Sequence, residues 1–146
     1  MNTLSGRLKL EEFDLMKMMI RNEQHTPHPQ FDWVWIYQLK QEILPPNVSE
    51  IIKRFKWESL QIFSVIIDNP VGIPEHQHSD DCEMYFGGDS FATMFIDNPW
   101  ENRKEIQMNW RNYSIVIPGW KHGIITDITT RILAVKFKTS VFPPQQ

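Results

Sequence analysis

The sequence has little of several features that would assign it to a class at once. Cys82 is the single cysteine among 146 residues, which excludes an intrachain disulfide and a cysteine-based zinc site. No apolar run approaches the ~18 residues of a membrane-spanning helix, and residues 1–12 carry charges where a signal peptide needs an apolar stretch. The net charge of −3 lacks the positive surplus typical of proteins that bind nucleic acids or anionic membranes. We therefore expect a cytoplasmic protein with no nucleic-acid partner and no membrane partner.

The composition that remains is that of an ordinary globular protein. Hydrophobic residues make up 41% and charged residues 23% of the chain, and a chain of this length can bury a core without covalent staples. Ten prolines against six glycines favour many short elements over a bundle of long helices. We interpret residues 1–146 as a single domain, with residues 1–56 as an extension packed on a β-rich core at residues 57–140.

Two helices and a strand are predicted in the N-terminal extension. Residues 8–22 repeat apolar side chains near a 3.6-residue period, which predicts an amphipathic helix. Residues 31–39 are rich in Trp, Ile and Tyr and are typical of a strand. Asn47, followed by Glu50, resembles a capping box and predicts a short helix over residues 48–55.

The core consists of short apolar runs separated by turn signals, a pattern typical of an antiparallel sandwich or barrel. The segment Gly87-Gly88-Asp89-Ser90 predicts a tight hairpin turn between the second and third runs. In the last run, Leu133, Val135 and Phe137 face one way, and Lys136 and Lys138 face the other. The runs are residues 60–67, 83–86, 91–96, 113–117, 122–126 and 131–138.

Three histidines and a glutamate in this core have a spacing suited to a metal ion. On a strand, His76 and His78 project to the same face, so both imidazoles can meet one ion. Glu83 follows after a polar link that lets the chain turn, so it can point back from the antiparallel neighbour. His122 can join from a distant strand. The His-x-His pair alone is a weak signal, because such a pair more often consists of surface or core histidines than of metal ligands.

Two segments strengthen the metal interpretation, because they resemble the two motifs of the cupin superfamily. The first segment, residues 72–88, reads GIPEHQHSDDCEMYFGG, and the second, residues 113–122, reads YSIVIPGWKH. They occur in the family's order and separation, and the resemblance covers residues 60–137. Ser90 stands where the first motif has a later glycine, and Thr126 stands where an asparagine often follows the second motif. These departures affect loop geometry more than the ligand set.

The resemblance implies the fold class and the site. It implies a mainly β protein with an antiparallel double-stranded β-helix, the jelly-roll or cupin barrel. To this barrel the local patterns above add an N-terminal helix and one short additional helix. It also implies that His76, His78, Glu83 and His122 bind one divalent transition metal ion. Such a ligand set suits Fe, Mn, Ni, Co or Zn, whereas Ca²⁺ prefers an all-oxygen shell. A small-molecule ligand is the implied partner, and because cupin-like barrels commonly pair, a homodimer is compatible with the sequence.

Strand parity adds pocket candidates beside the ligands. Tyr85 shares the face of Glu83, so it either hydrogen-bonds a ligand or fills the core. Trp120 shares the parity of His122 and either forms a wall of the pocket or packs at its rim.

Two further pocket candidates lie on other strands. Arg131 is in phase with the predicted inward stripe of the last run, so it either binds an anionic substrate or ends the strand in solvent. Gln61 is in phase with Phe63 and is a candidate for an amide behind the ligands.

The predicted function is metal-dependent chemistry on a small polar molecule. If the protein is an enzyme, the resemblance implies an isomerase or epimerase acting on sugars, or an Fe(II) dioxygenase, and no catalytic residue is assigned. The main alternative is a non-catalytic cupin that binds or senses a ligand, with a structural or ligand-holding metal. A barrel without metal is the third interpretation. An open pocket beside the metal would favour an enzyme, whereas a site closed by side chains would favour a structural metal.

Overall fold

The structure, a computed structural model, describes residues 5–7, 23–55, 57–68, 72–77, 80–87, 92–97, 103–109, 112–126 and 129–139. The helix predicted over residues 8–22 lies outside these residues. Within them, no helix has the length and apolar character needed to cross a membrane. The division into an extension and a core stays a prediction.

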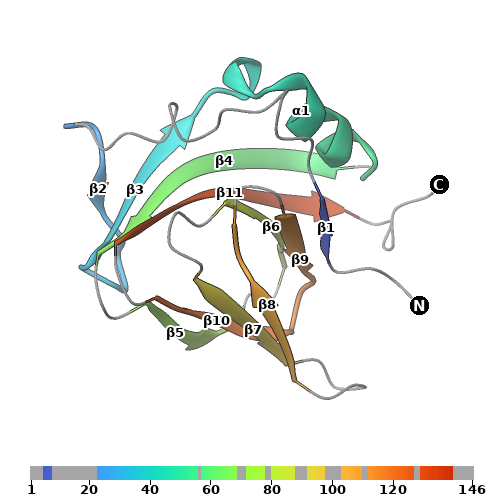
Figure 1. Cartoon of the computed structure of the whole chain (residues 1–146). Helices are drawn as coiled ribbons and strands as arrows, with labels where there is room; N and C mark the ends of the chain where they lie inside the picture. Colours follow the sequence, from blue (N-terminus) through green and yellow to red (C-terminus); the bar gives the residue numbers. More distant parts are fainter. Residues whose placement is uncertain are drawn as a thin grey trace.

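Two antiparallel sheets face each other (Figure 1). They do not close into one continuous barrel, and every pairing between the described strands is antiparallel. The larger sheet has the order β1 (Ser5–Arg7), β9 (Asn112–Val116), β6 (Cys82–Gly87), β11 (Thr130–Thr139), β4 (Trp57–Ile67), β3 (Val34–Leu39) and β2 (Thr26–Pro27). The smaller sheet has the order β5 (Ile73–His76), β10 (Lys121–Ile125), β7 (Thr93–Asp97) and β8 (Lys104–Gln107). This arrangement confirms the predicted jelly-roll class.

One short α-helix covers the outer face of the larger sheet (Figure 1). Helix α1 (Pro46–Lys53) follows a single 3-10 turn, η3 (Gln41–Ile43). Pro46 is tolerated in the first turn because its missing N–H would have no partner there. The three buried side chains of α1 have a spacing that places them on one face, and they are Val48, Ile51 and Ile52.

The predicted short helix is present but begins two residues earlier, and the predicted capping box does not form. The cap position is Pro45, which offers no side-chain hydrogen bond. Asn47 lies inside the first turn, where its Oδ1 accepts a hydrogen bond from the backbone N–H of Val48 at 3.0 Å. A proline at the cap therefore displaces the expected boundary toward the N-terminus.

The larger sheet buries apolar side chains on both faces. The face beneath α1 is packed by the cluster Leu44, Val48, Ile51, Ile52, Phe55, Ile62, Cys82, Met84, Phe86, Ile115, Leu133, Val135 and Phe137. The face toward the smaller sheet is packed by the cluster Val34, Val65, Ile67, Tyr85, Ala92, Met94, Ile96, Met108, Val116, Trp120, Ile124, Ile132 and Ala134. We call the face beneath α1 the helix-side face and the face toward the smaller sheet the inner face.

Two predictions about strand pairing are wrong. Residues 83–86 and 91–96 do not form a hairpin, because β6 pairs with β11 and β9 in the larger sheet and β7 pairs with β10 and β8 in the smaller one. Strands β6 and β7 thus lie in different sheets, and residues 88–91 between them lie outside the described part. Strand β5 and β6 are likewise in different sheets, so Glu83 does not approach His76 from a neighbouring strand.

Candidate metal centre

Three of the four predicted ligands meet between the two sheets. His76 at the end of β5 and His122 on β10 are register partners in the smaller sheet, and their ring centroids are 4.3 Å apart. Glu83 reaches them from β6 in the larger sheet. One potential ligand atom from each residue lies within 4.8 Å of the other two. His78, the fourth predicted ligand, lies outside the described residues.

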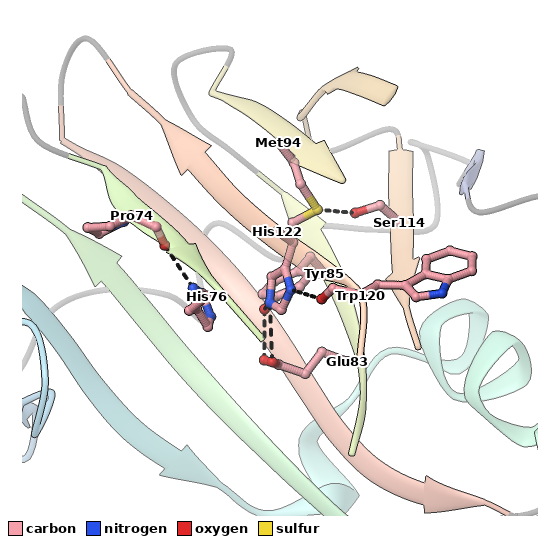
Figure 2. A network of polar contacts seen from close by, with 8 residues as sticks. All are labelled: Pro74, His76, Glu83, Tyr85, Met94, Ser114, Trp120 and His122. Carbon is pink, nitrogen blue, oxygen red and sulfur yellow. Dashed lines mark hydrogen bonds and ion pairs between the residues drawn. The ribbon is translucent and has the colours of Figure 1, made fainter. Parts of the chain in front are cut away.

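Each histidine is held by a backbone carbonyl two residues earlier in its own segment (Figure 2). The Nδ1 atom of His76 is 2.8 Å from the carbonyl oxygen of Pro74, and Nδ1 of His122 is 3.1 Å from that of Trp120. A carbonyl oxygen only accepts hydrogen bonds, so each Nδ1 carries the proton. In a neutral imidazole this leaves the lone pair on Nε2, the arrangement found around histidines that bind metals.

Glu83 is oriented by Tyr85, the next residue on its own face of β6. The Tyr85 hydroxyl donates a hydrogen bond to Oε2 of Glu83 at 2.8 Å, and it lies 3.3 Å from Nε2 of His122. The other carboxylate oxygen, Oε1, is 3.6 Å from the same Nε2 (Figure 2). Burial, followed by the charge of Glu83 and its hydrogen bond, raises the pKa of Tyr85 well above its usual range. Tyr85 is therefore a neutral donor at physiological pH.

The donor set and its burial fit a transition metal ion. Glu83 and His122 are only 7% and 1% exposed, and a buried carboxylate is costly unless it is paired or coordinates an ion. Two imidazole nitrogens and one carboxylate form the combination that non-haem Fe(II) proteins use with open coordination positions. The residues present therefore suit the group that the cupin resemblance implies.

A cavity of about 120 Å³ adjoins this centre and is bordered by His76, Glu83 and Tyr85. Lys136 and His28 are its other polar lining residues. Most of its wall is apolar and comes from the inner face, the segment before β3 and the start of β5, namely Phe31, Val34, Ile36, Phe63, Val65, Ile73 and Ala134. The centre therefore borders a partly open, mostly apolar cavity, as small-molecule sites usually do.

An aromatic segment lies over the His76 side of the cavity. The rings of His28 and Phe31 stack at 5.2 Å with an angle of 21° between them. Phe31 also contacts His76 at 6.0 Å between ring centroids and Trp33 at 5.6 Å. The indole N–H of Trp33 donates to the carbonyl oxygen of Gly72 at 2.6 Å, which links this segment to the start of β5.

Gly72, the first glycine of the cupin-like motif, is required by its surroundings. Its φ is 77°, a conformation that side chains rarely adopt. A Cβ atom at this position would clash with the carbonyl oxygen of Ile124 on β10. The glycine thus allows β5 to begin close against β10, which brings His76 beside His122.

Two of the four pocket candidates are in contact with the centre, in different ways. Tyr85 lines the cavity and contacts both Glu83 and His122. Trp120 contributes its carbonyl oxygen to His122, whereas its indole is directed away from the cluster (Figure 2). The buried Trp120 ring packs in the core of the inner face instead of lining the cavity.

The other two candidates do not line the cavity. Arg131 shares the parity of Leu133 and Val135, and these pack on the helix-side face. The predicted inward direction of that stripe is wrong for the pocket, because the residues of β11 that face the centre are Ile132, Ala134 and Lys136. Gln61 is the register partner of Lys136, so it belongs to the cavity's side of the sheet, but it is exposed.

The polar residues Lys136 and His28 and the aromatic residue Phe31 line the cavity although the sequence did not predict them there. The alternation of β11 assigns Lys136 to solvent, and only its register against Glu83 places it beside the centre. The apolar residues Ile132 and Ala134 on the same face were the available hint that this side is also covered. Nothing in the sequence around Pro27 and Pro29 indicates that His28 and Phe31 fold over His76.

The fold and the cluster together define a jelly roll with a candidate metal centre between its sheets. None of the protein-family models matches the chain, and no curated protein matches it in sequence. Among solved structures, it is similar to HEPD of Streptomyces albus with 2-hydroxyethylphosphonate and Fe(II) bound, at 11% identity and a TM-score of 0.57 over 82% of this chain and 25% of that chain.

Two further structures have the same fold. The hydroxypropylphosphonic acid epoxidase of S. wedmorenis is 17% identical, with a TM-score of 0.53 over 82% of this chain and 58% of that one. KdgF from Halomonas sp. is 9% identical, with a TM-score of 0.51 over 86% of this chain and 94% of that one. The chain thus spans a quarter of HEPD and somewhat over half of the epoxidase. At these identities the likeness concerns the fold.

Proposed function

We propose that the chain is an Fe(II)-dependent enzyme of the oxygenase type that acts on a small molecule in the cavity. The observation that carries this proposal is the convergence of His76, Glu83 and His122, with each imidazole held through Nδ1, beside a mostly apolar cavity. HEPD, a protein of the same fold, was solved with Fe(II) and its substrate. His78 is proposed as a further ligand, on the basis of the sequence motif.

When bound, Fe(II) supplies the dioxygen chemistry for which centres of two histidines and one carboxylate are used. The residues of the chain would do the rest. Pro74 and Trp120 hold the two imidazoles through their carbonyl oxygens, and Tyr85 holds one oxygen of Glu83. The apolar wall would limit the access of water to a bound substrate, which protects a reactive centre from side reactions.

The cavity favours this chemistry over sugar isomerisation. A polyhydroxylated substrate needs many polar partners, and the wall offers mostly aliphatic and aromatic carbon. An isomerase also needs a proton-transferring group that does not bind the metal. Tyr85 contacts the centre without being one of the proposed ligands, but its raised pKa makes it a poor base near neutral pH.

The open cavity also favours turnover over a purely structural metal. A structural centre is closed by its ligands, whereas His76, Glu83 and Tyr85 all reach the cavity. A non-catalytic protein that holds a ligand on the metal would have the same geometry. Oxygen consumption distinguishes these two cases.

The first test is metal content. Protein purified without an affinity tag is reconstituted anaerobically with Fe(II), desalted and analysed for metal. We expect about one equivalent in the wild type and almost none in Glu83→Gln or His122→Ala, because each removes a ligand from the same ion. Glu75→Gln is the matched control, since Glu75 lies on β5 but is exposed and pairs with Arg103 at 3.3 Å. Full metal content in Glu83→Gln would overturn the ligand assignment.

Two further measurements refine the result. His78→Ala tests the fourth ligand: retained iron with weaker affinity supports its role, and unchanged affinity removes it from the centre. Oxygen uptake by the iron-loaded protein is then screened with small organic acids, alcohols and phosphonates. Tight iron binding with no oxygen uptake for any of them would favour the ligand-binding or sensing alternative.

A further inference from the structure

Lys136 places a positive charge in the wall of the cavity. It lies on β11, the central strand of the larger sheet, and is half-buried on the inner face. Its register partners are Glu83 on β6 and Gln61 on β4. Ile132 and Ala134 precede it on the same face and are buried, so the lysine stands at the end of an apolar stripe and beside the metal cluster.

The ammonium group is not engaged by its neighbours. Directly opposite residues of an antiparallel pair have Cβ atoms about 5 Å apart, within easy reach for Lys136 and Glu83. Nevertheless, Lys136 forms no ion pair or hydrogen bond within the described part of the chain, whereas Glu83 is engaged by Tyr85 and His122. The carboxylate is thus directed toward the histidines, and the lysine charge is left for another anion.

The charge of the filled centre makes an anionic ligand favourable. Glu83 contributes one negative charge, and a divalent metal together with Lys136 contributes three positive charges. The remaining positive charge would border a mostly apolar wall, where an uncompensated charge is costly. A ligand that brings a negative group offsets this cost, and an ammonium binds it as a point charge with three donors.

We propose that Lys136 is the anion-binding residue of the cavity and that the ligand is a small organic acid. Its acidic group binds Lys136, its short apolar body contacts residues such as Phe63 and Val65, and its other end points toward the metal cluster. The orientation toward the cluster rests on the proposed function, whereas the contact with Lys136 requires no metal.

The test is a calorimetric titration with butyrate and with its neutral analogue butyramide. It is carried out on metal-free protein and on protein loaded with Zn(II), which has no redox chemistry. Lys136→Met removes the charge and keeps the length of the side chain, and Lys136→Arg keeps the charge. Lys138→Met is the matched control, because Lys138 is two residues further along β11, exposed, and not part of the cavity wall.

We expect butyrate to bind the wild type, Lys136→Arg and Lys138→Met, and to bind Lys136→Met at least about tenfold more weakly, the usual effect of losing a charge-assisted hydrogen bond. Butyramide binding should be insensitive to Lys136→Met. Butyrate should also tighten Zn(II) binding in the wild type and not in Lys136→Met, because coupling between two ligands is reciprocal.

The outcomes separate this inference from the proposed function. Butyrate binding that depends on Lys136 in metal-free protein supports the anion site even if the protein takes up no metal, a result that would overturn the proposed function alone. Normal metal uptake, with butyrate binding equally to the wild type and to Lys136→Met, overturns the anion site alone. Absence of butyrate binding in every form also overturns it.

Discussion

The two faces of the larger sheet are built from alternating residues of the same strands, yet they differ in content. On β6, Met84 and Phe86 lie on the helix-side face, and Glu83 and Tyr85 lie on the inner face. The helix-side cluster consists of buried apolar residues, whereas the inner face combines apolar packing with a buried carboxylate, a tyrosine hydroxyl and a cavity. Residues adjacent in sequence therefore have different roles. Those on the helix-side face pack the core, and those on the inner face form the candidate metal centre and its cavity.

Mutations on the two faces of the larger sheet should therefore have different effects. Substitutions on the helix-side face should lower the stability of the fold and leave the centre of the folded protein intact. Substitutions of the polar inner residues should change metal or ligand binding and have smaller effects on the metal-free fold.

The largest effect is expected from Phe137→Ala on the helix-side face. Phe137 is 1% exposed and packs against Phe55 with ring centroids 5.2 Å apart. Its loss should lower the free energy of unfolding by about 3–5 kcal/mol, the usual cost of removing a buried aromatic ring. Urea denaturation of the metal-free protein measures this effect. Loss of metal binding in the folded variant would show that the two faces are not independent.

Glu83→Gln should have a small effect on the metal-free fold and a large effect on metal binding, the opposite of Phe137→Ala. The variant preserves the shape of the side chain, so the metal-free stability should change less than in Phe137→Ala. In the wild type, metal at 100 times its dissociation constant should add about 2.7 kcal/mol of stability, because the ion binds the folded state. Thermal melts with and without Zn(II) check this prediction, and an equal metal-induced shift in the variant would contradict it.

Tyr85→Phe should have a more moderate effect on the same face. The substitution removes the hydrogen bond that orients Oε2 of Glu83. Metal affinity should fall by about 10–100-fold, as it does when the partner of a metal ligand is lost. Tyr113→Phe is the control, because Tyr113 packs against the helix-side cluster and its ring contacts Phe86. Competition titrations with a metal chelator would show equal affinities in both variants if Tyr85 only filled space.

The smallest effect concerns pH and Cys82 on the helix-side face. Burial, with a further contribution from the charge of Asp81, raises the pKa of Cys82 from 9.0 to about 11. The unfolded chain loses this proton near pH 9 and the folded chain keeps it, so stability is fully present below pH 9 and falls as pH rises toward 11. The contribution of Cys82 to this loss should be about 1 kcal/mol by pH 10.

Denaturation of the wild type and Cys82→Ala at pH 8 and pH 10 measures this contribution, which should be absent from the variant. Tyr85 also has a raised pKa, so part of the alkaline loss should remain in Cys82→Ala. A thiol reagent should react with the native protein slowly at neutral pH. Equal alkaline losses in the two proteins would contradict the assignment.

The sequence predicted much of the fold because apolar, β-branched runs of about five to eight residues bounded by turn residues indicate strands from local pattern alone. The strands around residues 60–67, 113–117, 122–126 and 131–138 are present, with boundaries shifted by a few residues. The order of the two cupin-like motifs led to the jelly-roll class. Strand β8 was not predicted, because Ile106 is the single apolar residue in its sequence KEIQ. The strand lies at an edge of the smaller sheet, where its residues are partly buried or exposed.

Which strands pair, and which face of each strand borders the centre, could not be predicted, because both depend on contacts between residues far apart in sequence. The turn signal at Gly87 indicated a hairpin, yet β11 occupies one side of β6 and β9 the other. Arg131 was a pocket candidate because β11 was expected to bury one face only. Because both faces of β11 are covered, the alternation of apolar residues does not indicate which face borders the cavity. Only the register against Glu83 shows that Lys136 faces the centre.

The partners that orient His76, His122 and Glu83 lie within two residues of them, at Pro74, Trp120 and Tyr85. Each side chain can therefore take its orientation within its own strand. Two of the strands pair in the smaller sheet and the third belongs to the larger one, so the full set exists only after the sheets have docked. The time at which a metal ion binds during refolding would therefore report on that docking step. The ion would bind when the two sheets meet, and not while either sheet forms.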